Sequence, residues 1–250
     1  MATAEDPTLT AERFIEKLMT FQSDEEKRKY HRYFKFDDDE SGDGDRFVGI
    51  RMGQVFAVAK EFIDLTPNEI EKLLESPVHE IRAGGCSVMG QQASHKRATA
   101  LQKRALYDLY LRRHDRINDW DLVDLAAHKV VGRYLYETSE SRAVLDQLAQ
   151  SENPWERRTA AVATLFLIAR HESADAYRIA ERLINDPFDL VNKAVGWILR
   201  EASKIDPATL QSLLARHAST MPRITLRTAL EHFPPEERKH WLSHHELKKA

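Results

Sequence analysis

The sequence is poor in the features that mark secreted, membrane-spanning or nucleotide-binding proteins. It has one cysteine among 250 residues, so no internal disulfide can form and we expect a reducing, cytoplasmic compartment such as the bacterial cytosol or nucleoid. No apolar run reaches the roughly 18 residues of a membrane span, and no signal peptide is predicted. Walker and GxGxxG phosphate loops are absent. The net charge of −3 indicates no global basic excess but allows a local basic groove.

Helical periodicity, in contrast, runs through almost the whole chain. Apolar residues recur at three- and four-residue spacing, as in Val55, Val58 and Phe62, and alternating strand patterns are scarce. This pattern predicts an all-α fold. A capping residue followed by proline is typical of a helix start. Such pairs are Thr66-Pro67, Ser76-Pro77, Asn153-Pro154, Asp186-Pro187 and Asp206-Pro207.

The predicted helix starts recur along the chain. Long helices opening near residues 76, 118, 153, 186 and 221 are separated by roughly 33 to 41 residues, with shorter amphipathic segments such as 138–150 and 173–184 between them. This period predicts an α-solenoid of HEAT-like, armadillo-type helical repeats, which we favour over an irregular helical bundle. We expect one domain over 1–250, with N-terminal helices (7–36), an acidic loop (37–48), helical repeats (49–243) and a tail (244–250).

The acidic loop resembles a calcium-binding loop at first sight. Counted from Asp37, oxygen ligands fall at several of the required positions, with Gly42 at the sixth. The twelfth position is Val48, where a bidentate glutamate is needed. We therefore expect a flexible acidic surface loop and no metal site.

One predicted helix start carries residues suited to chemistry. Trp120, Asp124 and His128 are spaced by four and so share one helix face. An indole face attracts cations, and a carboxylate beside it suits a substrate that is or becomes positively charged. The structural alternative is that Trp120 is core and Asp124 caps a helix or forms an ion pair.

Two further helix starts carry tryptophan with basic residues. Arg157 and Arg158 follow Trp155 and could clamp a phosphate or hold Asp124, the alternative being ion pairs between repeats. Lys193, Trp197 and Arg200 form one stripe on a later helix, the alternative being a core tryptophan with solvated basic residues.

Corresponding helices of a solenoid line one concave surface, so we expect these residues to converge on one groove. Further basic residues fit the same stripe and would make it a binding surface for a phosphate backbone. They are Arg82, Lys96, Arg97, Arg104, Arg112, Arg113, Arg116, Lys129, Arg133, Arg223 and Arg227.

Three of these segments resemble the AlkD family of bacterial alkylpurine DNA glycosylases, which are built from HEAT-like repeats. They are 118–124 (Asn-Asp-Trp-Asp-Leu-Val-Asp), 155–158 (Trp-Glu-Arg-Arg) and 193–200 (Lys-Ala-Val-Gly-Trp-Ile-Leu-Arg). A fourth segment, 47–51 (Phe-Val-Gly-Ile-Arg), resembles the family's early Gly-Ile segment. The similarity extends from about Phe14 to Phe233.

The resemblance implies a DNA repair glycosylase that removes cationic N3- or N7-alkylated purines from duplex DNA, without flipping the base into a pocket. It places the catalytic aspartate at Asp124, the paired tryptophans at Trp120 and Trp197, and the site arginine, holding the phosphate beside the lesion, at Arg158. No lysine lies in these motifs as a Schiff-base nucleophile, which indicates a monofunctional enzyme without lyase activity.

The expected DNA-contacting residues include a family tyrosine, which the resemblance places at Tyr30. The others are Arg51, Trp155, Arg157, Lys193, Arg200 and Arg227. We expect a monomer that needs no cofactor, binds alkylated duplex DNA and does not bind membranes. The competing hypothesis is a non-catalytic HEAT-like scaffold that binds DNA or protein.

Overall fold

In the computed structural model, every regular element of the described residues is a helix, which confirms the all-α prediction. The structure describes residues 9–30, 32–34, 45–138 and 140–246. The β-type contact among them is an isolated bridge between Arg46 and Val78. The chain divides into two compact units, Met1–Val130 and Val131–Ala250.

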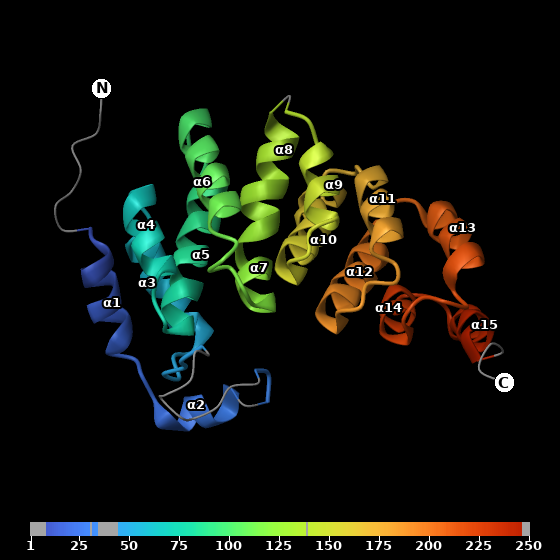
Figure 1. Ribbon diagram of the computed structural model, residues 1–250, viewed down its shortest axis with the longest axis horizontal. Helices are drawn as coiled ribbons and strands as arrows, with labels where there is room; N and C mark the ends of the chain where they lie inside the picture. Colours follow the sequence, from blue (N-terminus) through green and yellow to red (C-terminus); the bar gives the residue numbers. More distant parts are fainter. Residues whose placement is uncertain (1–8, 31, 35–44, 139, 247–250) are drawn as a thin grey trace. The chain divides into compact units, whose positions relative to one another are not determined.

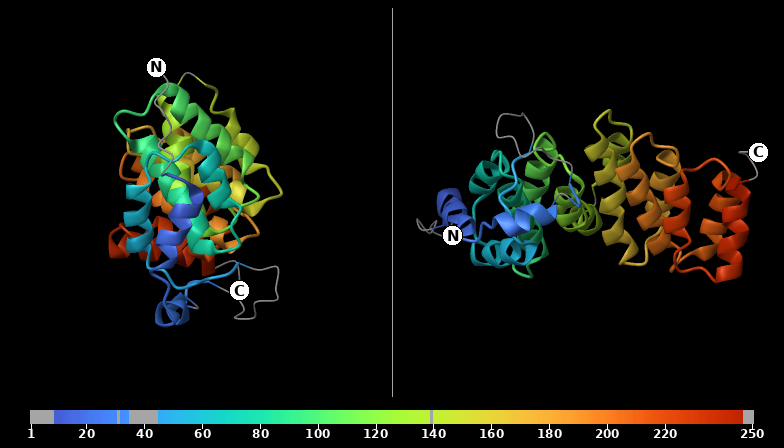
Figure 2. Two further views of the ribbon diagram at one scale, coloured as in Figure 1. Left: turned by 90° about the vertical axis from the view of Figure 1, so that its left-hand side faces the viewer. Right: turned by 90° about the horizontal axis from the view of Figure 1, so that it is seen from below.

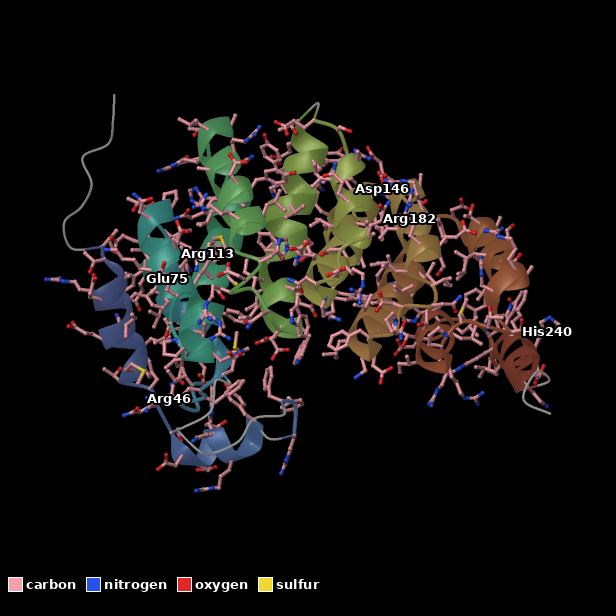
Figure 3. All side chains as sticks on the ribbon, viewed as in Figure 1. Arg46, Glu75, Arg113, Asp146, Arg182 and His240 are labelled. Carbon is pink, nitrogen blue, oxygen red and sulfur yellow. The ribbon has the colours of Figure 1, made fainter. Side chains whose placement is uncertain are left out.

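The first unit is a pair of helix rows. Its helices are α1 (Ala11–Met19), α2 (Asp24–Tyr30), α3 (Met52–Glu61), α4 (Pro67–Leu74), α5 (His79–Ser94), α6 (Ala100–Arg112) and α7 (Trp120–Ala127). α3, α5 and α7 pack side by side in one row, while α4 and α6 pack on each other and on α5 as the second (Figure 1). An ion pair of 3.3 Å between Glu75 and Arg113 joins the ends of α4 and α6 (Figure 3).

The second unit repeats this arrangement. It contains α8 (Arg133–Glu137), α9 (Ala143–Ala149), α10 (Pro154–Ile168), α11 (Ala174–Arg182), α12 (Asp189–Ala202), α13 (Pro207–His217), α14 (Arg223–Ala229) and α15 (Pro235–Glu246). α10, α12 and α14 form one row and α9, α11 and α13 the other, in chain order (Figure 2). Asp146 of α9 and Arg182 of α11 pair at 2.7 Å (Figure 3). These repeated helix pairs are those of the predicted α-solenoid.

A glycine allows two neighbouring helices of one row to pack closely. At Gly196 of α12, an added Cβ would lie 2.7 Å from Cβ of Thr228 in α14 and 3.0 Å from the carbonyl oxygen of Thr225. Neither atom can be displaced without moving the helix, so the spacing of α12 and α14 requires glycine here.

Three of the five predicted capping positions are correct. The side chains of Thr66, Asn153 and Asp206 accept backbone N–H groups at the starts of α4, α10 and α13. The predicted starts at Ser76 and Asp186 are wrong by a few residues, because α5 begins only at His79 and α12 only at Asp189.

The long helix of the sequence prediction is interrupted after α7. A π-helical turn, His128–Gly132, separates α7 from α8. Single π-turns inside helices occur frequently at functional sites. The turn changes the angular position of every later residue on this helix.

The remaining predictions about the chain concern its core and its ends. Cys86 is fully buried in α5, and burial raises the pKa of its thiol, as expected for a core residue. Among the described residues, no helix has the length and apolar character that crossing a membrane requires. α15 continues to Glu246, beyond the expected start of the tail at 244.

Candidate active site

The first two turns of α7 present a tryptophan and a carboxylate on one side. Asp119 caps the helix by accepting the N–H of Trp120 at 2.6 Å. Trp120 and Asp124 are both half-buried, whereas Leu122 and Val123 between them are fully buried. The helix therefore buries one side and leaves Trp120 and Asp124 on the partly open side, as their spacing predicts.

Trp120 rests on a column of aromatic rings from other parts of the first unit. Its ring stacks on Phe34 with centroids 5.5 Å apart and an interplanar angle of 17°. Phe34 lies 4.8 Å from Phe47, which stacks on His79 at 4.5 Å and 20°. Packed aromatic rings have few alternative positions, so the column fixes one face of the indole.

Tyr30 belongs to the support of this column. Its hydroxyl donates to the carbonyl oxygen of Ile50, and its ring makes edge contacts with Phe34 at 6.0 Å and Phe47 at 5.8 Å. Burial raises the pKa of the Tyr30 hydroxyl. The hydroxyl of Tyr30, which is expected to contact DNA, is thus bonded within the protein.

A buried histidine links α5 to the start of α7. His79 is 2% exposed, and its two ring nitrogens lie 2.9 Å from Asp45 Oδ2 and 2.8 Å from Asp121 Oδ2. Burial alone would lower the pKa of His79, but the charge and hydrogen bond of Asp121 and the bond to Asp45 outweigh it and raise the pKa to about 9. His79 is therefore an imidazolium at neutral pH and attracts both carboxylates.

The neighbouring glutamate of α5 holds the segment that carries Phe47. Glu80 is 1% exposed, and its carboxylate accepts the backbone N–H groups of Val48 at 3.1 Å, Gly49 at 2.8 Å and Ile50 at 3.3 Å. Gly49 has a φ of +77°, which a side chain rarely adopts. The bend at Gly49 turns three N–H groups toward the Glu80 carboxylate. These bonds hold the segment next to Phe47 and so fix Phe47 in the aromatic column.

One group of side chains has the spacing of a metal site. Oxygen and nitrogen atoms of Asp45, His79 and Asp119 lie within 4.8 Å of one another. The charged imidazole of His79 and the guanidinium of Arg82, which donates to Asp45, already neutralise this group. A protonated imidazole cannot ligate a metal ion, so the proton on His79 and the guanidinium of Arg82 balance the charge of these carboxylates without one. Of the expected acidic loop, 37–48, residues 37–44 lie outside the described residues.

In the second unit, Arg157 is bonded within the protein. Its guanidinium forms a two-point pair with Asp186 at 2.6 and 3.1 Å and also donates to the carbonyl oxygens of Ser151 and Glu152, both at 2.9 Å. Trp155 packs edge-on against Phe188 at 5.3 Å. The geometry of Arg157 corresponds to the structural alternative, an ion pair between successive repeats.

Arg158 is also directed inward. It is 4% exposed, and its Nη1 donates to the carbonyl oxygen of Leu190 in α12. A buried guanidinium that bonds to the next helix has little surface left for a phosphate. This position favours a structural role in holding the start of α12.

The remaining candidates lie on α12, on α14 and at the start of α3. Trp197 is half-buried, and Lys193, one turn earlier, is exposed. Arg200 is paired with Glu201 at 3.0 Å and with Glu231, while Arg227 is exposed. In the first unit, Arg51 is exposed and pairs with Glu26 at 2.6 Å.

The prediction that the further basic residues form one exposed stripe is wrong for two of them. Arg82 is fully buried and donates to the carbonyl oxygen of Ser76 at 3.1 Å, as well as to Asp45. Arg113, whose side chain is 13% exposed, pairs with Glu71 at 3.0 Å. Both arginines hold helices of the first unit together, so neither is part of an open basic surface.

Sequence reasoning missed the network beneath Trp120. His79 and Glu80 belong to none of the motifs that the sequence shows. Their partners lie 30 or more residues away in the chain, at Asp45, at Asp121 and in the segment 48–50. The sequence signal for this network was the apolar Gly-Ile segment around Gly49, because the bend that faces Glu80 requires a glycine at that position.

Comparison with known proteins identifies the family. The chain matches the model of the family described as DNA alkylation repair enzyme over residues 14–233. Among solved structures it is similar to a protein described as a predicted DNA alkylation repair enzyme from Enterococcus faecalis, with a TM-score of 0.61 and 19% identity, over 76% of this chain and 90% of the other. At that identity the likeness shows the fold alone. No curated protein matches the chain. Because the family match spans most of the sequence, the chain belongs to the DNA alkylation repair enzyme family.

Proposed function

We propose that this protein is a DNA glycosylase that hydrolyses the N-glycosidic bond of N3- and N7-alkylated purines in duplex DNA and leaves an abasic site. The observation that carries the proposal is the half-buried pair of Trp120 and Asp124 on one side of α7, with Trp120 fixed on the aromatic column. Membership of the DNA alkylation repair enzyme family supports it.

The chemistry of the substrate explains why a carboxylate and an indole suffice. Alkylation at N3 or N7 places a positive charge on the purine, which is then a good leaving group and needs little protonation. As the bond to the sugar breaks, positive charge develops on the deoxyribose. A preorganised carboxylate such as Asp124 stabilises that charge most where water is excluded, and a water molecule then attacks the sugar. A cation–π contact with Trp120 adds about 0.5 to 2 kcal/mol.

Residues of the second unit complete the proposal. We assign Trp197, which is half-buried, to the same reaction by its resemblance to the paired family tryptophan. Exposed Lys193 and Arg227 are assigned to phosphate contacts. For Arg158 and Arg157 we propose a positioning role, because their guanidinium groups bond to Leu190 and Asp186. In this proposal the second unit binds DNA through the exposed Lys193 and Arg227, and the inward-directed Arg157 and Arg158 do not contact DNA.

The test is release of free base from three matched duplexes, containing N7-methylguanine, N3-methyladenine or no lesion. Release from either alkylated duplex and not from the undamaged one supports the glycosylase. The competing scaffold hypothesis predicts binding to all three duplexes and release from none. That second result would overturn the proposal.

A further inference from the structure

The buried ring of His79 contacts two structures that support the candidate active site. One is the first turn of α7, where His79 Nε2 lies 3.0 and 2.8 Å from the two carboxylate oxygens of Asp121. The other is the aromatic column, because the His79 ring lies 5.0 Å from Phe34, the ring that stacks on Trp120. One side chain thus connects the helix that bears Asp124 with the rings that support Trp120.

Both ring nitrogens of His79 face carboxylates. On the edge of the ring away from Asp121, Nδ1 lies 2.9 Å from Asp45 Oδ2. A neutral imidazole has one N–H group and donates to one side only, whereas an imidazolium donates to both. The two contacts therefore require the charged ring, and at 2% exposure the ring has little access to water that could replace either bond.

The place of Asp121 on α7 makes this connection relevant to the reaction. Asp121 directly follows Trp120 and lies about one turn before Asp124, so a displaced helix start would move both groups. The flat ring of His79 also stacks on Phe47 at an interplanar angle of 20°, a contact that a flexible side chain would not keep. A displacement of about 1 Å at a reacting group can slow a reaction by up to about 100-fold.

We propose that His79 is a positioning residue of the candidate active site, which holds Trp120 and Asp124 in the arrangement that base release requires. It acts through Asp121 and through the aromatic column, and its burial keeps it from contacting DNA. The inference rests on the proposed glycosylase and adds a residue that lies outside the segments resembling the family.

The first measurement is independent of catalysis. In isotope-labelled protein, nuclear magnetic resonance of the Trp120 indole N–H, assigned by the loss of its signal in Trp120→Phe, shows whether the ring holds one position. We expect one sharp signal in the wild type and a broadened or split signal in His79→Gln. The matched control is Glu71→Gln, which breaks ion pairs of the same unit with Arg112 at 2.8 Å and Arg113 at 3.0 Å and should leave the signal unchanged.

The second measurement is single-turnover release of N7-methylguanine from a duplex at saturating protein, with the Kd for the same duplex measured in parallel. We expect a rate constant at least about tenfold lower in His79→Gln, with Kd within about threefold of the wild type, and the wild-type rate constant in Glu71→Gln. A loss of stability alone lowers the fraction of active protein but not the rate constant at saturation. In the double variant with Asp121→Asn, the loss should be close to the larger single loss, because both changes act through one contact.

An unchanged Trp120 signal in His79→Gln, an unchanged rate constant at saturation, or single losses that multiply in the double variant would overturn the positioning role. If circular dichroism shows that His79→Gln does not fold, Asp121→Asn, which keeps the shape of the carboxylate and removes its charge, is used for both measurements with the same expected results. If the Trp120 signal changes as expected but the wild type releases no base, the glycosylase proposal fails while His79 still positions Trp120.

Discussion

Replacing His79 by glutamine removes the buried charge that joins α5 to the start of α7. In the folded protein His79 is 2% exposed, contacts Asp45 and Asp121 at 2.9 and 2.8 Å, and has a pKa of about 9. Histidine in an unfolded chain titrates near its ordinary pKa of 6.5. Folding therefore favours the protonated ring.

The size of the effect follows from this difference in pKa. A rise from 6.5 to about 9 corresponds to about 3 kcal/mol, at ~1.4 kcal/mol per pKa unit. Because the folded pKa is the higher one, this stabilisation is complete below pH 6.5 and is lost as the pH rises through 9. Over this range the unfolding free energy of the wild type should fall by about 3 kcal/mol relative to that of His79→Gln.

Urea unfolding followed by circular dichroism measures the difference, at one pH below 6.5 and one above 9. The matched control is His232→Gln, which changes an exposed histidine. The unfolding free energy of this variant should fall with rising pH as steeply as that of the wild type. Nuclear magnetic resonance of the ring protons of His79 gives its pKa directly. If the unfolding free energy of His79→Gln fell as steeply with rising pH as that of the wild type, the stabilising role of the His79 charge would be refuted.

Three further substitutions test the support of the site. Burial raises the pKa of Asp119 from 3.8 to about 6, so its charge opposes folding above that pH. Asp119→Asn keeps the cap and removes this charge, so at ~1.4 kcal/mol per pKa unit it should raise the unfolding free energy above pH 6 by up to about 3 kcal/mol. A decrease would contradict this. Gly49→Ala should lower the unfolding free energy by at least about 2 kcal/mol, because φ at this position is +77° and an added Cβ would lie 2.1 Å from the carbonyl oxygen of Ser23. Urea unfolding measures this change, and an unchanged unfolding free energy would contradict the prediction. Arg158→Ala should lower the melting temperature and leave the salt dependence of DNA binding unchanged. If the slope of log binding constant against log salt concentration became smaller by about one, Arg158 would instead contact a phosphate directly.

The sequence predicted the repeat architecture because periodicity and capping are local signals. Asn153-Pro154 and Asp206-Pro207 begin helices where expected. The helix predicted to start at Asp186 begins only at Asp189, because the Asp186 carboxylate accepts the N–H of Phe188 and pairs with Arg157. A local pattern does not show that a capping residue has a distant partner.

The candidate site was predictable in part for the same reason. The spacing of Trp120 and Asp124 places both on one side of a single helix, which periodicity shows. The depth of Arg158 and the pairing of His79 with Asp121 depend on packing between helices far apart in the sequence.

The most direct test of the account is the effect of Asp124→Asn on base release. The measurement is single-turnover release of N7-methylguanine from a duplex, with binding to the same duplex measured in parallel. The matched control is Asp108→Asn, which alters an exposed aspartate paired with Arg104 on α6. We predict that Asp124→Asn folds and binds DNA but releases base at least about 100-fold more slowly, the scale expected when a preorganised electrostatic group is removed from the transition state. Release by Asp124→Asn at the wild-type rate would contradict the assignment of Asp124 as the catalytic carboxylate.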